Sequence, residues 1–292
     1  MQKRFWLNML LALVVLGLTL AVIFGVTRHR KPAFPTLLAI SPEAVRRFAY
    51  GRPHHPVVVF RKIGKQWWLI HPFRARAQNL ELVSLIDELD EPIRHRYPVS
   101  RIPPARVGLA PPRLTLWVNH DRLAFGRTDP VGDRRYIEAG PWIDLVRDVL
   151  YYRLAGNFYT LLSTRLLPGG SHLTELKLPQ VTFRRNAKGG WILTPPRSQV
   201  SSGMIARLIR HWTYASALSV GPPGRIKSLG RVSLRLAGVP EALSYVLASD
   251  SFGVALVGHN PPLRWVFPHL IARKMLHLSA NRRPPHARAP RS

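Results

Sequence analysis

Basic side chains gather around a hairpin phrase that the chain carries twice, "FRKIGKQWWLIHP" from residue 60 and "FRRNAKGGWILTP" from residue 183. Three basic residues recur at the same positions of each copy: Arg61, Lys65 and Arg74, then Arg184, Lys188 and Arg197. Clustered cationic groups attract anions, so these two basic rims are candidate binding sites for an anionic lipid headgroup or an acidic glycan. A positively charged face that simply meets solvent explains the same pattern without a ligand.

The sequence offers little recognisable catalytic chemistry. It contains no cysteine, and the common motifs for phosphate binding, nucleophilic serine or zinc proteolysis do not occur. The histidine pair at 54–55 lies between prolines and lacks a convincing carboxylate partner for a metal. The acids at 87–91, and likewise Asp144 and Asp148, are expected to form surface ion pairs with nearby arginines. We therefore predict no catalytic residue, no metal and no cofactor.

The net charge is strongly positive, with 43 Lys and Arg against 15 Asp and Glu, formally +28. Such a charge favours polyanionic partners. The arginines are nevertheless dispersed along the chain, which is also typical of a genome with a biased base composition. The sequence contains no recognisable nucleic-acid-binding module, so a nucleic-acid partner is not predicted.

The repeat extends beyond the basic residues. Aligned without gaps at an offset of 123, the two halves share ten identities over the 31 positions from Pro56 to Ile86. They include an aromatic residue and a proline at the same places in each copy: Trp68 and Pro72, then Trp191 and Pro195. We predict that both tryptophans pack between a sheet and a helix as core anchors, and that both prolines end a strand. The pattern indicates a duplication.

Each copy reads as a β-hairpin followed by a helix. In the first copy the helix covers "NLELVSLIDELDE", with Leu80, Val83 and Ile86 on one face, and in the second it opens at Ser201 or Ser202. Between the copies, "WIDLVRDVLYYRLAGNFYTLL" is apolar at helical spacing and predicts a linking helix. The fold class expected is α+β, with two tandem antiparallel sheets that are each covered by a helix.

An apolar run precedes the repeats. Residues 5–26 read "FWLNMLLALVVLGLTLAVIFGV", and 22 helical residues extend roughly 33 Å, enough to cross a bilayer. We therefore predict a single-pass anchor with its flank over 1–31, a first α+β unit over 32–160, a second unit over 161–272, and a basic tail over 273–292. The charges that flank the run are nearly balanced and do not set its orientation.

Several short motifs resemble a bacterial membrane-anchored family of unknown function, the domain-of-unknown-function family numbered 4340. They are "WLIHP", "LIDEL", "VGLAPP", "RLAFG" and "RRYIEAG" leading into "WIDLV", and they cover roughly residues 35–158. The family tends to have Ala-Asp before its helix, whereas this chain has Ala77-Gln78 followed by Asn79. The resemblance implies an inner-membrane protein whose body faces the periplasm, near ABC transport components, and it implies no catalytic residue.

Two functions follow as expectations. The first is a noncatalytic, membrane-tethered accessory or scaffold protein of an envelope transport complex, with ABC transporter subunits among its partners. The second is a binding module for an anionic lipid or glycan that uses the basic rims.

Overall fold

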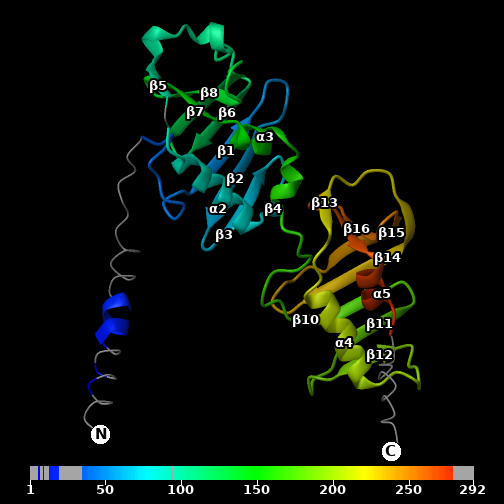
Figure 1. Cartoon of the computed structure of the whole chain (residues 1–292). Helices are drawn as coiled ribbons and strands as arrows, with labels where there is room; N and C mark the ends of the chain where they lie inside the picture. Colours follow the sequence, from blue (N-terminus) through cyan, green and yellow to red (C-terminus); the bar gives the residue numbers. More distant parts are fainter. Residues whose placement is uncertain (1–5, 7–8, 10–12, 20–34, 94, 279–292) are drawn as a thin grey trace, which may run out of the picture.

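The computed structural model describes residues 6, 9, 13–19, 35–93 and 95–278. Two antiparallel sheets of nine and eight strands form most of this part of the chain, as Figure 1 shows. The first sheet contains β1 (Arg47–Gly51), β2 (Val58–Ile63), β3 (Gln66–His71), β4 (Ala75–Arg76), β5 (His95–Pro98), β6 (Leu114–Val118), β7 (Asp121–Thr128), β8 (Arg134–Ala139) and β9 (Trp142–Arg147). The second contains β10 (Leu173–Leu178), β11 (Val181–Arg185), β12 (Trp191–Thr194), β13 (Ser219–Gly221), β14 (Lys227–Leu236), β15 (Leu243–Asp250), β16 (Gly253–Gly258) and β17 (Arg264–Pro268).

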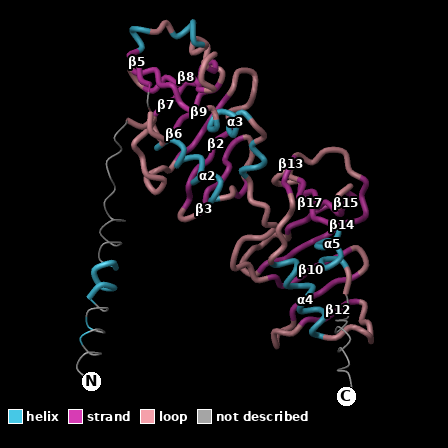
Figure 2. Tube along the Cα trace, in the orientation of Figure 1, coloured by secondary structure: helices cyan, strands magenta, loops and turns pink. Residues whose placement is uncertain are grey.

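The helices within residues 35–278 are short and lie against the sheets, as Figure 2 shows. They are α2 (Asn79–Asp87), α3 (Val149–Ala155), α4 (Ser202–Thr213) and α5 (His269–Leu276), with the 3₁₀ turns η1 (Glu88–Asp90), η2 (Val99–Arg101), η3 (Pro104–Val107) and η4 (Phe158–Leu161). Buried apolar residues of α2 and α4 pack in the same core cluster as the inner faces of the strands. Burial of these faces is what holds such short helices in place, since helices of this length are marginal alone.

The two sheets share one strand order. The first runs β4-β3-β2-β1-β6-β7-β8-β9-β5, and the second runs β12-β11-β10-β14-β15-β16-β17-β13. The orders coincide when β1–β3, β6–β9 and β5 are matched with β10–β12, β14–β17 and β13, and only β4 has no counterpart. The peptide bonds before the repeated Pro72 and Pro195 are both cis. The repeat seen in the sequence thus corresponds to a repeated path of the chain.

The strand register differs from the gapless alignment by one residue within the hairpins. In β2–β3, Lys62 lies opposite Trp67, with four residues between them, whereas in β11–β12 Arg185 lies opposite Trp191, with five. A bulge in the β2–β3 pairing restores the alignment before the prolines. The structural counterpart of Trp191 is therefore Trp67, not Trp68.

This register corrects the predicted core anchors. Trp67 is 1% exposed and fully in the core, whereas Trp68 is half-buried on the other face of β3. Trp191 is also half-buried and packs at the margin of the core. Successive side chains of a strand point to opposite faces, so the choice between neighbouring tryptophans depends on a register that the repeat alone does not fix.

The expected α+β class is wrong. Of the residues that the structure describes, 41% are in strands and 23% in helices, and the strands form antiparallel sheets. The predicted linking helix accounts for part of the difference, because its first third is β9, followed by the seven-residue α3 and the 3₁₀ turn η4. β9 pairs with both β8 and β5, and these ladders override the helical spacing of Ile143 and Val146. The stripe predicted for α2 is also displaced, since Leu82, Leu85 and Ile86 are buried while Leu80 is 77% exposed.

The predicted anchor over residues 5–26 falls largely outside the described residues. Within it, the described residues 6, 9 and 13–19 are helical. In the part of the chain that the structure describes, no helix has the length and apolar character needed to cross a membrane.

Candidate functional site

The strongest candidate site is a solvent-open hollow of about 290 Å³ in the second half of the chain. We call it the basic pocket. It lies between α4, the loop before β10 and the β11–β12 hairpin, and its cationic and aromatic wall consists of Arg165, His172, Arg185, Arg210, Trp191 and Tyr214. Among the described residues that line it, none is a carboxylate. An open, positively charged hollow with aromatic walls suits an anionic ligand.

Helix α4 supplies one wall. Ser201 caps the helix, its hydroxyl accepting a hydrogen bond from the Met204 amide at 3.3 Å, as the sequence predicts. The buried side chain of Trp212 donates from Nε1 to the Met275 carbonyl at 2.7 Å, which fixes α4 against α5. With this face turned inward, Arg210 is exposed on the pocket side.

The β11–β12 hairpin supplies the second wall. Arg185 and Trp191 lie directly opposite each other in the register. The turn between them is closed by Asn186, whose amide oxygen accepts from the Gly190 amide at 2.8 Å. Gly189 has φ of 80°, a conformation that a glycine adopts without strain. Arg185 donates from Nε to the Gly189 carbonyl at 3.3 Å, so its guanidinium is held beside the turn.

The loop before β10 completes the pocket. Arg165 and Ser216 form an isolated β-bridge, which brings the loop alongside the end of α4. The tight turn that follows has Gly170 at φ of 76° and leads to His172. Three arginines from three separate segments therefore converge on one hollow.

No carboxylate lines the pocket among the described residues, and Glu175 on the neighbouring β10 is engaged by other cations. Glu175 on β10 is bonded to Lys177 at 3.2 Å and Arg184 at 2.9 Å. Burial raises the pKa of Glu175, but the hydrogen bonds from these two cations outweigh it and leave the pKa below its usual value. Its negative charge is thus already used within the sheet.

His211, next to Arg210 on α4, has a pKa that its surroundings lower. Burial lowers the pKa of His211, and the charges of Lys274 and Arg210 lower it further. The imidazole is therefore neutral at pH 7 and adds no charge of its own at this end of α4.

The residues predicted from sequence do not gather in this pocket. The first-copy residues Arg61, Lys65 and Arg74 are exposed around the first hairpin, and the guanidinium of Arg74 lies 5.1 Å from the ring centre of Trp68. In the second copy, Arg184 is engaged by Glu175, Lys188 is exposed in the turn, and Arg197 lines a different hollow. Of the ten residues predicted, only Trp191 lines the basic pocket, where it is a wall and not a buried anchor.

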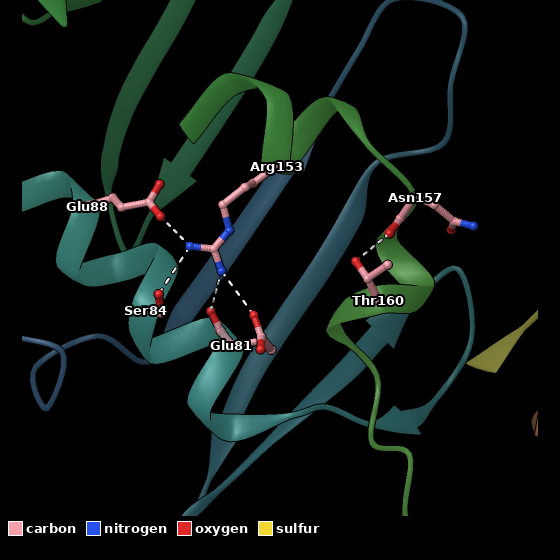
Figure 3. A network of polar contacts seen from close by, with 6 residues as sticks. All are labelled: Glu81, Ser84, Glu88, Arg153, Asn157 and Thr160. Carbon is pink, nitrogen blue, oxygen red and sulfur yellow. Dashed lines mark hydrogen bonds and ion pairs between the residues drawn. The ribbon is translucent and has the colours of Figure 1, made fainter. Parts of the chain in front are cut away.

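Sequence reasoning missed Arg165, His172 and Arg210. Arg165 and His172 belong to the loop before β10 and Arg210 belongs to α4, so only the fold brings the two segments together. The expected ion pairs of the acidic cluster are present, since Glu88 bonds Arg153 and Glu91 bonds Arg147. The first of these pairs is drawn in Figure 3. Asp144 and Asp148, by contrast, are buried, and they pair with Arg96 and Arg135 from other strands.

Comparisons with family models, with curated proteins and with solved structures found no match. The resemblance to family 4340 stays a prediction, and so do the accessory role, the envelope partners and the periplasmic location.

Proposed function

We propose that the protein is a noncatalytic binding module that takes an acidic glycan in the basic pocket. The observation that carries the proposal is the convergence of Arg165, Arg185 and Arg210 on one open hollow whose described lining has no carboxylate. Arginine binds carboxylate groups through paired hydrogen bonds, and these contacts are stronger than bonds between neutral groups.

The aromatic walls favour a glycan over an isolated anion. Trp191 and Tyr214 line the pocket beside the arginines, and flat aromatic surfaces present an apolar body with a polar edge, which suits the mixed surface of a sugar ring. The pocket is also open to solvent, so a unit within a polymer can enter it without its ends being enclosed.

The test is binding of the full-length protein to polygalacturonate, a linear uronate polymer, measured by isothermal titration calorimetry at low salt. The double variant Arg185→Gln with Arg210→Gln removes two charged contacts, each worth about 1.5–3 kcal/mol, so affinity should fall at least about tenfold. Arg231→Gln with Arg235→Gln is the matched control, because both side chains are exposed on β14 and outside the pocket lining.

The control separates a site from a general charge effect. If both double variants lose affinity equally, the net charge and not the pocket binds the polymer, and the proposal fails. Neutral dextran should not bind. If vesicles that contain phosphatidylglycerol bind through Arg185 and Arg210 while polygalacturonate does not, the ligand is a lipid headgroup and the glycan proposal is wrong.

A further inference from the structure

One face of the first sheet carries a row of arginines beside a tryptophan. Arg47 on β1 lies directly opposite Arg61 on β2, and Arg61 lies opposite Trp68 on β3. Their neighbours Phe48 and Phe60 are buried in the core that α2 covers, and successive residues of a strand point to opposite faces. The row therefore lies on the side of the sheet away from α2. We call this surface the outer face, and it consists of Arg47, Arg61, Trp68, Arg74 and Trp117.

The three arginines of the outer face form no ion pair with any described residue. Like charges directly opposite each other in a ladder destabilise a sheet, so Arg47 and Arg61 are an unfavourable pair. The guanidinium of Arg74 adds a third positive charge, 5.1 Å from the ring centre of Trp68. Arg61 and Arg74 are exposed and Arg47 is half-buried. An anion bound at the outer face would relieve the repulsion between them.

The second sheet has a different pair at the corresponding place. Arg184 is the counterpart of Arg61 in the repeat, and the residue directly opposite it on β10 is Glu175, whereas Arg61 faces Arg47. Glu175 bonds Arg184 at 2.9 Å, which neutralises the charge within the sheet. The repeated path of the chain therefore accepts an ion pair at this place. The like-charged pair is a property of the first copy and not a requirement of the fold.

Aromatic residues are the second difference between the two copies. Trp68 lies opposite Arg61, where the second sheet has Ile192, and Trp117 lies on β6, where the second sheet has Ser233. Both tryptophans are half-buried. The indole of Trp117 reaches over β1, since a Cβ at Gly51 would lie 3.8 Å from its Cζ3. The first copy thus combines uncompensated arginines with indole surface, and the second copy has neither.

The charges and the indoles of the outer face favour the same kind of ligand. Neighbouring strands are about 4.8 Å apart, so Arg47 and Arg61 are close enough to bind a single carboxylate together. An indole presents an apolar body with a polar edge, which suits the mixed surface of a sugar ring. A polymer of acidic sugars supplies both the carboxylates and the rings, whereas an isolated anion supplies only the charge.

We propose that the outer face is a second binding surface for an acidic glycan, with Arg47 and Arg61 on the uronate carboxylates and Trp117 beside the sugar rings. The class of ligand rests on the proposed function, whereas the surface itself shares no residue with the basic pocket. The matching face of the second sheet, where Glu175 engages Arg184, is not expected to bind the glycan.

The experiment titrates the full-length protein with polygalacturonate at low salt by isothermal titration calorimetry. Arg47→Glu gives the first copy the charges of the second, so the variant should fold, with a melting temperature no lower than that of the wild type. Its affinity should nevertheless fall at least about tenfold, because one contact is lost and Arg61 becomes paired. Arg61→Gln should weaken binding to a similar extent. Arg184→Gln removes the same charge from the matching position and should leave the affinity unchanged, because Glu175 already engages Arg184.

The pocket variant Arg185→Gln with Arg210→Gln separates the two sites. If it weakens binding while Arg47→Glu does not, the glycan binds at the pocket alone and the outer face is not a site. If Arg47→Glu weakens binding while the pocket variant does not, the outer face binds the glycan and the pocket proposal fails. Equal losses for Arg61→Gln and Arg184→Gln would show that net charge binds the polymer, which overturns the outer face as a site. Binding of oligothymidylate through Arg47 in the absence of polygalacturonate binding would overturn it as well, in favour of a nucleic acid.

Discussion

The ion pair between Arg135 and Asp148 is predicted to be the most sensitive single contact in the first sheet. The two side chains are 4% and 8% exposed, and they form two parallel bonds of 2.5 and 2.8 Å. Arg135 also donates to the Gly126 carbonyl at 2.5 Å and to the Thr128 hydroxyl at 3.1 Å, while its guanidinium lies 3.4 Å from the ring centre of Tyr151. Nearly every donor of this arginine is therefore used inside the protein.

Arg135→Met removes these bonds and leaves the carboxylate of Asp148 buried without its cation. Breaking a buried pair in this way costs about 3–5 kcal/mol, because an uncompensated charge remains in the interior. With a melting temperature that changes by about 2–4 °C per kcal/mol for a domain of this size, the transition should fall by roughly 10 °C. The assay is urea unfolding followed by tryptophan fluorescence, with thermal melts in parallel.

Two variants test the reasoning behind this value. Arg122→Met breaks the exposed pair with Glu138, in which Arg122 is 48% exposed, and should cost no more than about 1 kcal/mol. Arg135→Met combined with Asp148→Leu removes both charges and should recover more than half of the loss. A cost below about 1 kcal/mol for Arg135→Met, or a double variant as unstable as the single one, would refute the idea that desolvation of Asp148 sets the penalty.

Three further outcomes are expected. Trp67→Ala should cost about 3–5 kcal/mol in urea unfolding and Trp68→Ala no more than about 1 kcal/mol, because only Trp67 is fully buried; the opposite order would contradict the register of β3. Asn79→Ala should cost about 1–3 kcal/mol, since this side chain bonds the Trp67 amide and the Lys65 carbonyl, each at 2.9 Å; an unchanged unfolding midpoint would show that these bonds contribute nothing. Because the folded-state pKa of His211 lies below its ordinary value of 6.5, the unfolded chain binds more protons as the pH falls. Stability should therefore decrease below about pH 6.5, and His211→Gln should flatten this decrease in melts between pH 7 and 5; an identical slope in the variant would exclude His211 as its source.

The hairpins were the part of the fold that the sequence predicted well. Alternating β-branched and aromatic residues around short turns placed strands where β2–β3 and β11–β12 are found, and of the two serines predicted as caps, Ser201 is the one that caps α4. Local patterns suffice here because a hairpin is closed by residues that are near each other in the chain.

The remaining features depend on partners that are distant in the chain. The segment of β9 has helical spacing, but its strand pairing with β5 and β8, and the bidentate bond of Asp144 to Arg96, decide its conformation. The basic pocket was missed for the same reason. Arg165 and Arg210 stand 45 positions apart and meet only because a β-bridge at Arg165 brings the loop to the end of α4.

The ends of the two sheets have a consequence for how other proteins can attach. The outermost strands are β4 and β5 in the first sheet and β12 and β13 in the second, and none is longer than four residues. Prolines end β5 and follow β12 and β13 directly, and proline has no amide hydrogen to offer to an added strand. Short, proline-bounded borders of this kind resist strand-by-strand stacking of copies and recruitment of an extended peptide as an extra strand. A partner protein should therefore recognise the loops and side chains of this molecule, and should not add a strand to the edge of either sheet.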